Sequence, residues 1–583
     1  MKTRFRLLAL ALAASPALAG LPNNGPAPTT PPPAVAPTPA PTSPLSDDLV
    51  FRALRDELAR AKSLHMNRAE KPYYLTAVCT EEEGFQVAAS FGSLQNRGTG
   101  KRSVLSVAVR VGSPALDNTN FADASDFSSF MKGGGGAGRA SPAEPDYDAF
   151  RHALWLQFDD AYKGAVETLA KKRAYLQSNQ VHDRPADFTP AQTVSFVEPR
   201  QALKVDQNRW TALVKRASAV FRDHPLIATS SVTFGARVNH QTFVSSDPAQ
   251  HRFAEPLSQL SISAETQAPD GMALKIERNL MGRTEADLPT DDDILKLARA
   301  TADRLDAMAN SKVASEDYTG PVLFTGRAAA LFMLQTLGEP LSHPRDDLGD
   351  GRAGRLVDRL GKHVTARGIT VRDDPGLKQW HDQPLLGYYP VDDECVKPQP
   401  LVLVDDGVLK TYFMSRVPTG RINQSNGHLR GDSASASNLF VESKTPMTRA
   451  ALKQKLMDLA KEEDLEYGLL VDDLDEGGAH HFSGGGEGSA GVSLPAPTGV
   501  FRIYPDGHEE LVRGIVFKPA TFRVLKDIVG LGNDATATNL VHRGQHVAVV
   551  TPSVLVKTLE MTKVREENER PPLTPRPLLS KQP

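Results

Sequence analysis

Residues 320–338 read GPVLFTGRAAALFMLQTLG, an apolar stretch that opens the second half of the chain. Before it, a helical pattern ends within residues 311–320. After it, the sequence changes to short strand-like runs separated by turns. The runs 401–404 and 408–413 flank Asp-Asp-Gly, and the runs 500–504 and 510–516 flank Pro-Asp-Gly, so each pair predicts a hairpin. We therefore predict a β-rich C-terminal domain over residues 313–562.

The segment before this domain differs in its predicted secondary structure, because long amphipathic helices alternate there with strand-like runs. Apolar spacing predicts helices over residues 147–176, 206–222 and 290–309, and strands over 227–238, 257–264 and 272–280. Further helices are expected over residues 448–463 and 521–529. The fold class predicted is α+β: a mixed α/β domain over residues 46–312, the β-rich domain over 313–562, and a charged, proline-rich tail over 563–583.

The first residues have the pattern of a targeting sequence. Residues 1–19 have a basic start, a short apolar run and Ala17-Leu18-Ala19 before Gly20, which is typical of a secretory signal. Residues 20–45 are rich in Pro and Ala and predict an extended linker. We therefore expect export to a periplasm or to the extracellular space. Export permits a Cys79–Cys395 bridge, but two isolated buried thiols are the preferred interpretation.

Composition and motif searches exclude several classes of function. The 583 residues carry 67 basic and 70 acidic side chains, a net charge of −3, and no basic block that would indicate nucleic-acid binding. After residue 20 no run approaches the roughly 20 apolar residues of a membrane span. No complete catalytic constellation is present. His508-Glu509 has no second His at helical spacing, and the acidic clusters 392–394 and 472–476 are typical of solvated turns.

Two histidine pairs are candidate metal ligands. His542 and His546 are four residues apart, but Arg543-Gly544 between them indicates a turn followed by a strand, so a solvated pair is favoured. His480 and His481 precede a Gly/Ser tract, which gives little rigid support for a metal. No cofactor is expected from these patterns.

Several short sequence blocks follow the stretch 320–338 along the chain. They read LGKHV (360–364), TVRDDP (370–375), YPVDDE (389–394), SNGHLR (425–430), SNLF (437–440), GVFR (499–502) and LKDIVG (525–530). In the first half KPYY (71–74), RVG (110–112), LDNT (116–119) and ALWL (153–156) form a similar set. In these blocks the chain resembles the TldD/PmbA family, described as zinc-dependent peptidases and as modulators of DNA gyrase.

The chain differs from that family at the positions of the zinc ligands. The resemblance implies H-E-x-x-x-H on the helix after the first strand, where this chain has Met333, Leu334 and Gly338. It also implies a Cys ligand in a C-G-K-x-G-Q segment, which aligns with residues 540–545 and contains no cysteine. Since none of these side chains can hold zinc or move a proton, the resemblance points to the non-catalytic member of a pair.

Three functions remain open. The first is a silent subunit, in a homodimer or paired with a catalytic TldD-like paralogue, that binds unfolded peptide along a sheet edge. Its candidate groove residues are Asp392, Asp393, Glu394, Asn426, Gly427, His428 and Arg430, although Asn-Gly equally indicates a structural turn. The second is a peptidase whose zinc is held by a non-standard set drawn from His428, His480, His481, His542 and His546. The third is an envelope structural or interaction protein.

Overall fold

Strict alternation of apolar and polar residues builds one long-stranded sheet from the first half of the chain. In β6 (Ile227–Ser245), Val232, Phe234 and Ala236 are buried on one face, while the residues between them are only half-buried on the other. The strand order is β3-β2-β1-β6-β7-β5, with β4 paired to β2 and β8 paired to β7. The remaining strands are β1 (Pro72–Ser90), β2 (Ser93–Ser113), β3 (Leu116–Asp117), β4 (Arg139–Ala140), β5 (Phe196–Val197), β7 (Gln250–Gln267) and β8 (Ala273–Gly282).

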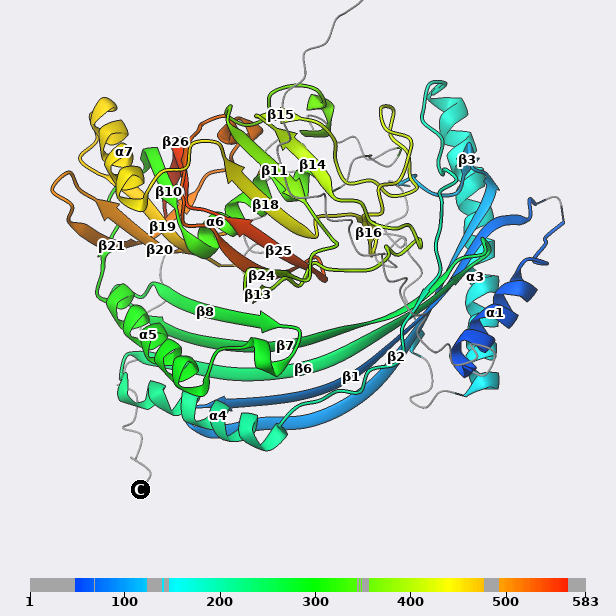
Figure 1. Cartoon of the computed structure of the whole chain (residues 1–583), viewed down its shortest axis with the longest axis horizontal. Coiled ribbons are helices and arrows are strands. Elements are labelled where there is room, and N and C mark those ends of the chain that lie inside the picture. Colours follow the sequence, from blue (N-terminus) through cyan, green and yellow to red (C-terminus); the bar gives the residue numbers. More distant parts are fainter. Residues whose placement is uncertain are drawn as a thin grey trace, which may run out of the picture. The chain divides into compact units, whose positions relative to one another are not determined.

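Two helices cover the apolar face of this first sheet. They are α4 (Gln207–Ala219) and α5 (Asp291–Ala309), which lie on its outer side in Figure 1. Trp210 of α4 is fully buried and stacks on Phe234 at 3.7 Å between ring centroids. Asp206 and Thr290 cap the two helices by accepting hydrogen bonds from backbone N–H groups of the first turn. Both helices lie where the apolar spacing predicted them.

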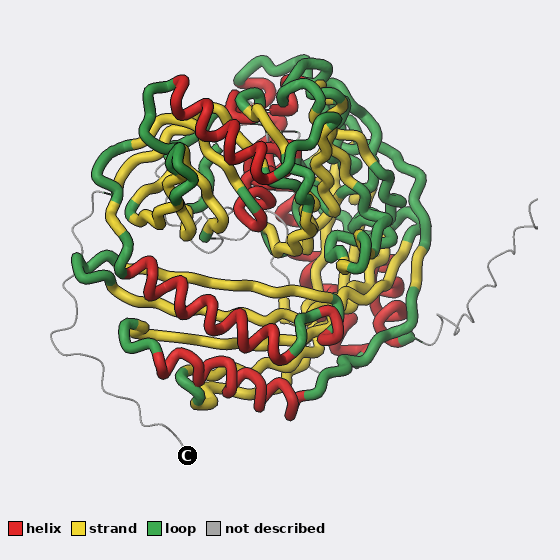
Figure 2. Tube along the Cα trace, turned by 60° about the vertical axis from the view of Figure 1, so that its left-hand side comes forward, coloured by secondary structure: helices red, strands yellow, loops and turns green. Residues whose placement is uncertain are grey.

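The opposite end of the sheet is packed against α1 (Leu49–Ala61) and α3 (Tyr147–Ser178), which contact each other. Asp48 and Asp146 are their N-caps. Figure 2 shows helices on this sheet and, across from them, the strands of the second half. The structure describes residues 48–67, 69–122, 139–140, 146–342, 345, 348, 356–475 and 492–564. The predicted signal, linker, most of the tail, His480 and His481 lie outside these ranges.

The second half forms two further sheets around one apolar core. One sheet has the order β22-β26-β10-β19-β20-β21-β9, with β23 on β26, and the other has the order β15-β14-β11-β18-β25-β24. The strands of the former are β9 (Lys312–Val313), β10 (Tyr318–Phe324), β19 (Gly468–Leu474), β20 (Pro497–Ile503), β21 (Glu509–Arg513), β22 (Ile515–Phe517), β23 (Ile528–Leu531) and β26 (Val554–Lys563). Those of the latter are β11 (Ile369–Asp373), β14 (Leu401–Asp405), β15 (Val408–Leu409), β18 (Asn438–Ser443), β24 (Thr536–His542) and β25 (Gln545–Thr551).

Helix α6 (Gly326–Met333) lies inside this core, directly after β10, and α7 (Arg449–Glu462) covers the sheet of β10 and β19 from outside. Two small hairpins, β12 (Gln379–Trp380) with β13 (Gln383–Pro384) and β16 (Leu429–Arg430) with β17 (Ser433–Ala434), complete the described strands. The architecture is α+β, as predicted from the sequence, and both predicted hairpins are present.

One predicted helix is wrong. Residues 521–529 form a short 3₁₀ turn at Phe522–Leu525 and then enter β23, which pairs with β26. Val524 and Leu525 are buried by the turn, and the β-branched Ile528 and Val529 that follow extend a sheet instead of continuing a helix. Cys79 and Cys395 are buried free thiols. Among the described helices, none combines the length and apolarity that crossing a membrane requires.

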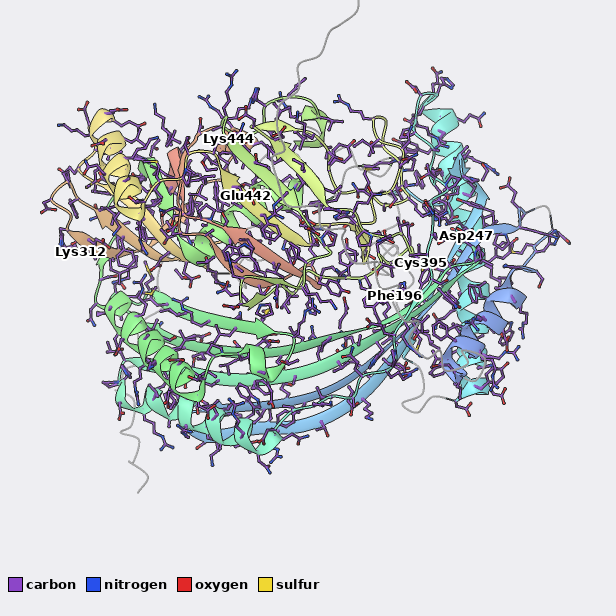
Figure 3. All side chains as sticks on the ribbon, viewed as in Figure 1. Phe196, Asp247, Lys312, Cys395, Glu442 and Lys444 are labelled. Carbon is purple, nitrogen blue, oxygen red and sulfur yellow. The ribbon has the colours of Figure 1, made fainter. Side chains whose placement is uncertain are left out.

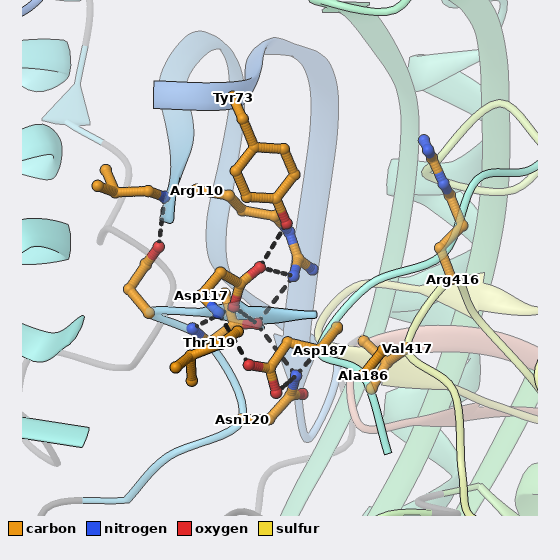
Figure 4. A network of polar contacts seen from close by, with 12 residues as sticks. Tyr73, Arg110, Asp117, Thr119, Asn120, Ala186, Asp187, Arg416 and Val417 are labelled. Atoms are coloured by element: carbon orange, nitrogen blue, oxygen red, sulfur yellow. Dashed lines mark hydrogen bonds and ion pairs between the residues drawn. The ribbon is translucent and has the colours of Figure 1, made fainter. Parts of the chain in front are cut away.

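A buried polar network joins the two halves. Lys172 of α3 is fully buried and donates to Asp187 at 2.7 Å, and Arg345 of the second half donates to the other oxygen of the same carboxylate at 3.0 Å. Beside it, Asp117 accepts from Tyr73 at 2.6 Å and from Arg110 at 3.0 Å (Figure 4). Because every charge is paired, this network holds the segments 116–120 and 183–188 in place and supplies no free acid or base.

Candidate functional site

The two histidine positions and the glutamate position of the family's metal motif are apolar and buried. Met333 ends α6 and is 0% exposed, and Leu334 is 1% exposed. Leu540, at the cysteine position, is also 1% exposed and belongs to the same core cluster. A Cβ added to Gly338 would lie 3.0 Å from Leu334 Cδ1, so these positions pack against one another. Hydrocarbon therefore fills the place that metal ligands would occupy.

The helix that the resemblance makes the ligand-bearing one, called here the ligand helix, contains a π turn in this chain. Residues Leu334–Gly338 form a π-helical turn, in which the N–H of Glu339 bonds to the carbonyl of Leu334 five residues earlier. A π turn brings residues five apart, such as 333 and 338, towards one face of the helix, and such turns are frequent at functional sites. The spacing that two ligands would need is retained, whereas the donor atoms are absent.

The hairpin that replaces the cysteine segment holds an ion pair. β24 ends at His542, Arg543 and Gly544 make a two-residue turn with positive φ, and β25 follows, so the predicted turn and strand are confirmed. His542 Nε2 lies 2.7 Å from a carboxylate oxygen of Glu339, and Arg543 pairs with the other oxygen. Glu339 directly follows the π turn, so this contact joins the hairpin to the end of the ligand helix.

His542 and His546 are not brought together. Val541 is the cross-strand partner of His546, and side chains of opposed residues share a face. His542 is the next residue after Val541, so its side chain lies on the other face of the hairpin. Across the ranges that the structure describes, no group of three His, Cys, Asp or Glu residues could hold a metal ion. The residues present do not fit the family's zinc.

The acidic block predicted to bind peptide is used by the chain's own backbone. Asp392 is 0% exposed and accepts from the N–H groups of Glu394 and Val396, at 3.0 and 2.7 Å. Asp393 accepts from the Gly431 N–H at 2.6 Å, and Glu394 accepts from a backbone N–H of the loop that follows β15. The three carboxylates thus fasten their turn to the segment 414–431.

The second predicted block, residues 426–430, faces the first. Asn426 accepts from the Met414 N–H at 2.8 Å, and a Cβ on Gly427 would lie 2.6 Å from the Lys397 carbonyl oxygen. His428 is 0% exposed and lies between Asn426 and Asp373. The structure brings the two blocks together as buried supports of their turns. Their peptide-binding role stays a prediction.

Burial sets the protonation of these carboxyls. It raises the pKa of Asp393 to about 6, and it raises the pKa of Asp392 well above its usual range, with repulsion from Glu394 adding to the effect. The pKa of Glu394 is raised by burial too, although Arg110 opposes the shift. The favourable partner of Asp393 is the Arg430 guanidinium.

Arg430 contacts Glu255, which lines a cavity that the sequence did not predict. Its side chain is 4% exposed, lies over the Tyr389 ring and donates to Glu255 of β7 at 2.9 Å. Glu255, Arg283 and His546 help to line a cavity of about 20 Å³, room for a water molecule. Burial lowers the pKa of His546 to about 4, so its imidazole is neutral at pH 7. Only the pairing of two distant segments creates this cavity, and no local motif predicts it.

A Cys–His–Gln arrangement lies at the junction of the two halves, and no local motif predicts it. Figure 3 labels its cysteine, Cys395. Cys395 Sγ lies 3.5 Å from His251 Nδ1, and His251 Nε2 lies 3.1 Å from Gln241 Oε1. Both Cys395 and His251 are 0% exposed. Burial raises the pKa of the thiol and lowers the pKa of His251 to about 3. Because both groups stay neutral and closed to solvent, they do not form a nucleophile.

Comparison with known proteins agrees with this fold. Residues 317–563 match the family described as "PmbA/TldA metallopeptidase C-terminal domain". A metalloprotease of Methanothermobacter thermautotrophicus is 24% identical over 316 residues, which are 53% of this chain and 63% of that protein. One of Archaeoglobus fulgidus is 36% identical over 75 residues, 13% of this chain and 16% of that protein. The chain thus spans less than two-thirds of these curated relatives.

Two solved structures share the fold. A Thermotoga maritima protein described as a candidate modulator of DNA gyrase superposes with a TM-score of 0.58 at 16% identity, covering 88% of this chain and 100% of that one. TldE from Thermococcus kodakarensis superposes with a TM-score of 0.56 at 11% identity, with the same coverage. The fold and the matched domain define a metallopeptidase-like protein. Residues 317–563 belong to the TldD/PmbA family, and the rest of the chain shares the fold of its solved members.

Proposed function

We propose that this chain is a catalytically silent member of the TldD/PmbA family that binds extended peptide and serves as a partner subunit. One observation carries the proposal: Met333, Leu334, Gly338 and Leu540 fill the expected metal site with packed hydrocarbon. Without ligands or a general base, the site has no means to activate water. What remains is a scaffold whose long strands suit recognition of an extended chain.

The partner and the location belong to the same proposal. The resemblance implies a dimer, either of two copies of this chain or with a catalytic TldD-like paralogue that supplies the zinc. The sequence of residues 1–19 supports export, to a periplasm or to the extracellular space. N-terminal sequencing of the protein recovered outside the cytoplasm should then begin at Gly20.

A peptidase with a non-standard metal set is the less favoured function. His542 Nε2 and Glu339 Oε2, which are 2.7 Å apart, are both atoms that could ligate a metal. Arg543, however, pairs with the same carboxylate. A cation at this position would have to displace that guanidinium. No third ligand completes the set among the described residues.

Cleavage and binding can be separated in one experiment. The mature chain is incubated with reduced, carboxymethylated α-lactalbumin, which cannot refold, with and without added zinc chloride. We expect the polypeptide to bind and to remain intact by mass spectrometry. Zinc-dependent fragments that disappear in His542→Ala would contradict the silent assignment, and light scattering of the same sample reports whether the chain is a dimer.

A further inference from the structure

The cavity that His546 lines contains polar groups that the chain itself does not pair. Segments of both halves enclose it: residues 253–256 of β7 and the end of β8 on one side, and the loop 386–390 and β25 on the other. Its polar lining consists of Glu198, Glu255, Arg283 and His546. The volume of about 20 Å³ exceeds what one water molecule needs, so the cavity can admit part of a small ligand.

His546 is the most enclosed of these polar groups. It is 7% exposed, and its ring bonds to no side chain or backbone group in the ranges described. Burial lowers the pKa of His546 to about 4, so at pH 7 one ring nitrogen donates a hydrogen bond and the other accepts one. Buried polar groups in folded proteins are nearly always hydrogen-bonded. A buried imidazole without a partner, on the wall of a cavity, therefore points to a ligand that supplies one.

The two halves also bring charges to the cavity that are not balanced. Arg283 donates to the Leu385 carbonyl at 2.9 Å and lies over the Tyr388 ring, but it pairs with no carboxylate among the described residues. Glu255 is already paired, because it accepts from Arg430 at 2.9 Å.

Glu198 is the remaining carboxylate of the cavity. Its side chain is half-buried and pairs with no residue in the described ranges, Arg283 included. Leaving a partly buried charge without a counter-charge costs free energy. One cation and one carboxylate, both unpaired and separate from each other, therefore lie beside a neutral imidazole.

We propose that this cavity binds a small zwitterion, a free α-amino acid, with its carboxylate on Arg283 and its ammonium group on Glu198. His546 donates its N–H to the same carboxylate. A ligand with only a carboxylate is repelled by Glu198, and a ligand with only an amine is repelled by Arg283. The small volume favours the smallest members of the class, glycine and alanine. This inference goes beyond the proposed function, because it requires neither an extended chain nor a partner subunit.

The lining of the cavity differs between its inner and outer parts. Phe253, Leu386 and His546 are buried, whereas Glu198 and Tyr388 are only half-buried and reach solvent. A small molecule can therefore enter past Glu198 and Tyr388 and meet apolar side chains further in. Small-molecule sites commonly combine apolar walls with a few polar groups that orient the ligand.

Binding of three matched ligands to the full chain tests the proposal. Glycine carries both charges at pH 7, whereas acetate carries only the carboxylate and methylamine only the ammonium group. Acetate and methylamine are smaller than glycine, so size cannot exclude them. Isothermal titration calorimetry measures each Kd. We expect glycine to bind, and acetate and methylamine to bind at least about tenfold more weakly.

Charge-removing variants locate the ligand. Glu198→Gln and Arg283→Gln should each raise the Kd of glycine by about tenfold or more, and Glu198→Gln should bind acetate more tightly than the wild type does. A role in folding alone would not improve acetate binding. The matched controls are Glu265→Gln and Arg299→Gln, which make the same chemical changes at exposed positions of β7 and α5 and should bind glycine like the wild type. Thermal midpoints report whether each variant is folded.

Three results would overturn the inference, and each leaves the proposed function standing. No heat of glycine binding by the wild type, together with an unchanged thermal midpoint in excess glycine, would show that the cavity holds water alone. Acetate that binds as tightly as glycine would make the cavity a site for anions. An unchanged Kd of glycine in folded Glu198→Gln and Arg283→Gln would place the amino acid elsewhere on the chain.

Discussion

Leu334→Ala tests whether the expected metal site is hydrocarbon core. Leu334 is 1% exposed and stands at the position of the family's general base. The substitution removes three carbon atoms, worth about 0.8 kcal/mol each in transfer free energy, and leaves a cavity that α6 and the sheet of β18, β25 and β24 cannot fully close. We expect the free energy of unfolding to fall by about 3–4 kcal/mol. Urea titration followed by circular dichroism and tryptophan fluorescence measures this change.

The matched control is Leu226→Ala, because Leu226 is 46% exposed and the chemical change is the same. A surface Leu loses little on truncation, so this variant should stay within about 0.5 kcal/mol of the wild type. Equal effects of the two substitutions would refute the reasoning. They would mean that position 334 faces an open, solvated site, as a catalytic residue would.

Three further predictions follow from buried charges. Burial raises the pKa of Asp393 from 3.8 to about 6, so its ionisation destabilises the fold as pH rises through that interval. Asp393→Asn should therefore raise the urea midpoint at pH 8 and leave it unchanged near pH 3.5, and a decrease at pH 8 would contradict this. His546 has its pKa lowered from 6.5 to about 4, so its stabilising neutral form is lost as pH falls from 6.5 through 4. His546→Gln should flatten the dependence of the thermal midpoint on pH in this window, whereas His508→Gln, at an exposed turn, should follow the wild type. Lys172→Met leaves the fully buried Asp187 short of one partner and should cost roughly 3 kcal/mol in urea, and a loss below 1 kcal/mol would argue against a structural network.

Local patterns predicted the long elements of the fold and missed the short ones. The helices α3, α4, α5 and α7 follow from apolar spacing at helical period with a capping residue before each. The segment 521–529 misled because its apolar residues fit a helix and a strand equally well, and pairing with β26 decided the outcome. Sheet order could not be predicted, since parallel pairs such as β18 with β25 join segments about a hundred residues apart.

Only part of the candidate site could be predicted from the sequence. The absence of ligands at Met333, Leu334 and Gly338 could be read from the sequence, because side-chain chemistry alone excludes zinc there. The His542–Glu339 contact could not, since it needs a hairpin tip and a helix end 203 residues apart to meet.

Metal content tests the central claim most directly. The mature chain is purified without affinity-tag histidines, incubated with excess zinc, passed through a desalting column and measured by elemental analysis. The packed positions 333, 334, 338 and 540 predict far less than one equivalent of zinc. Near-stoichiometric zinc that survives desalting and is lost in His542→Ala would contradict the account and identify a working metal centre.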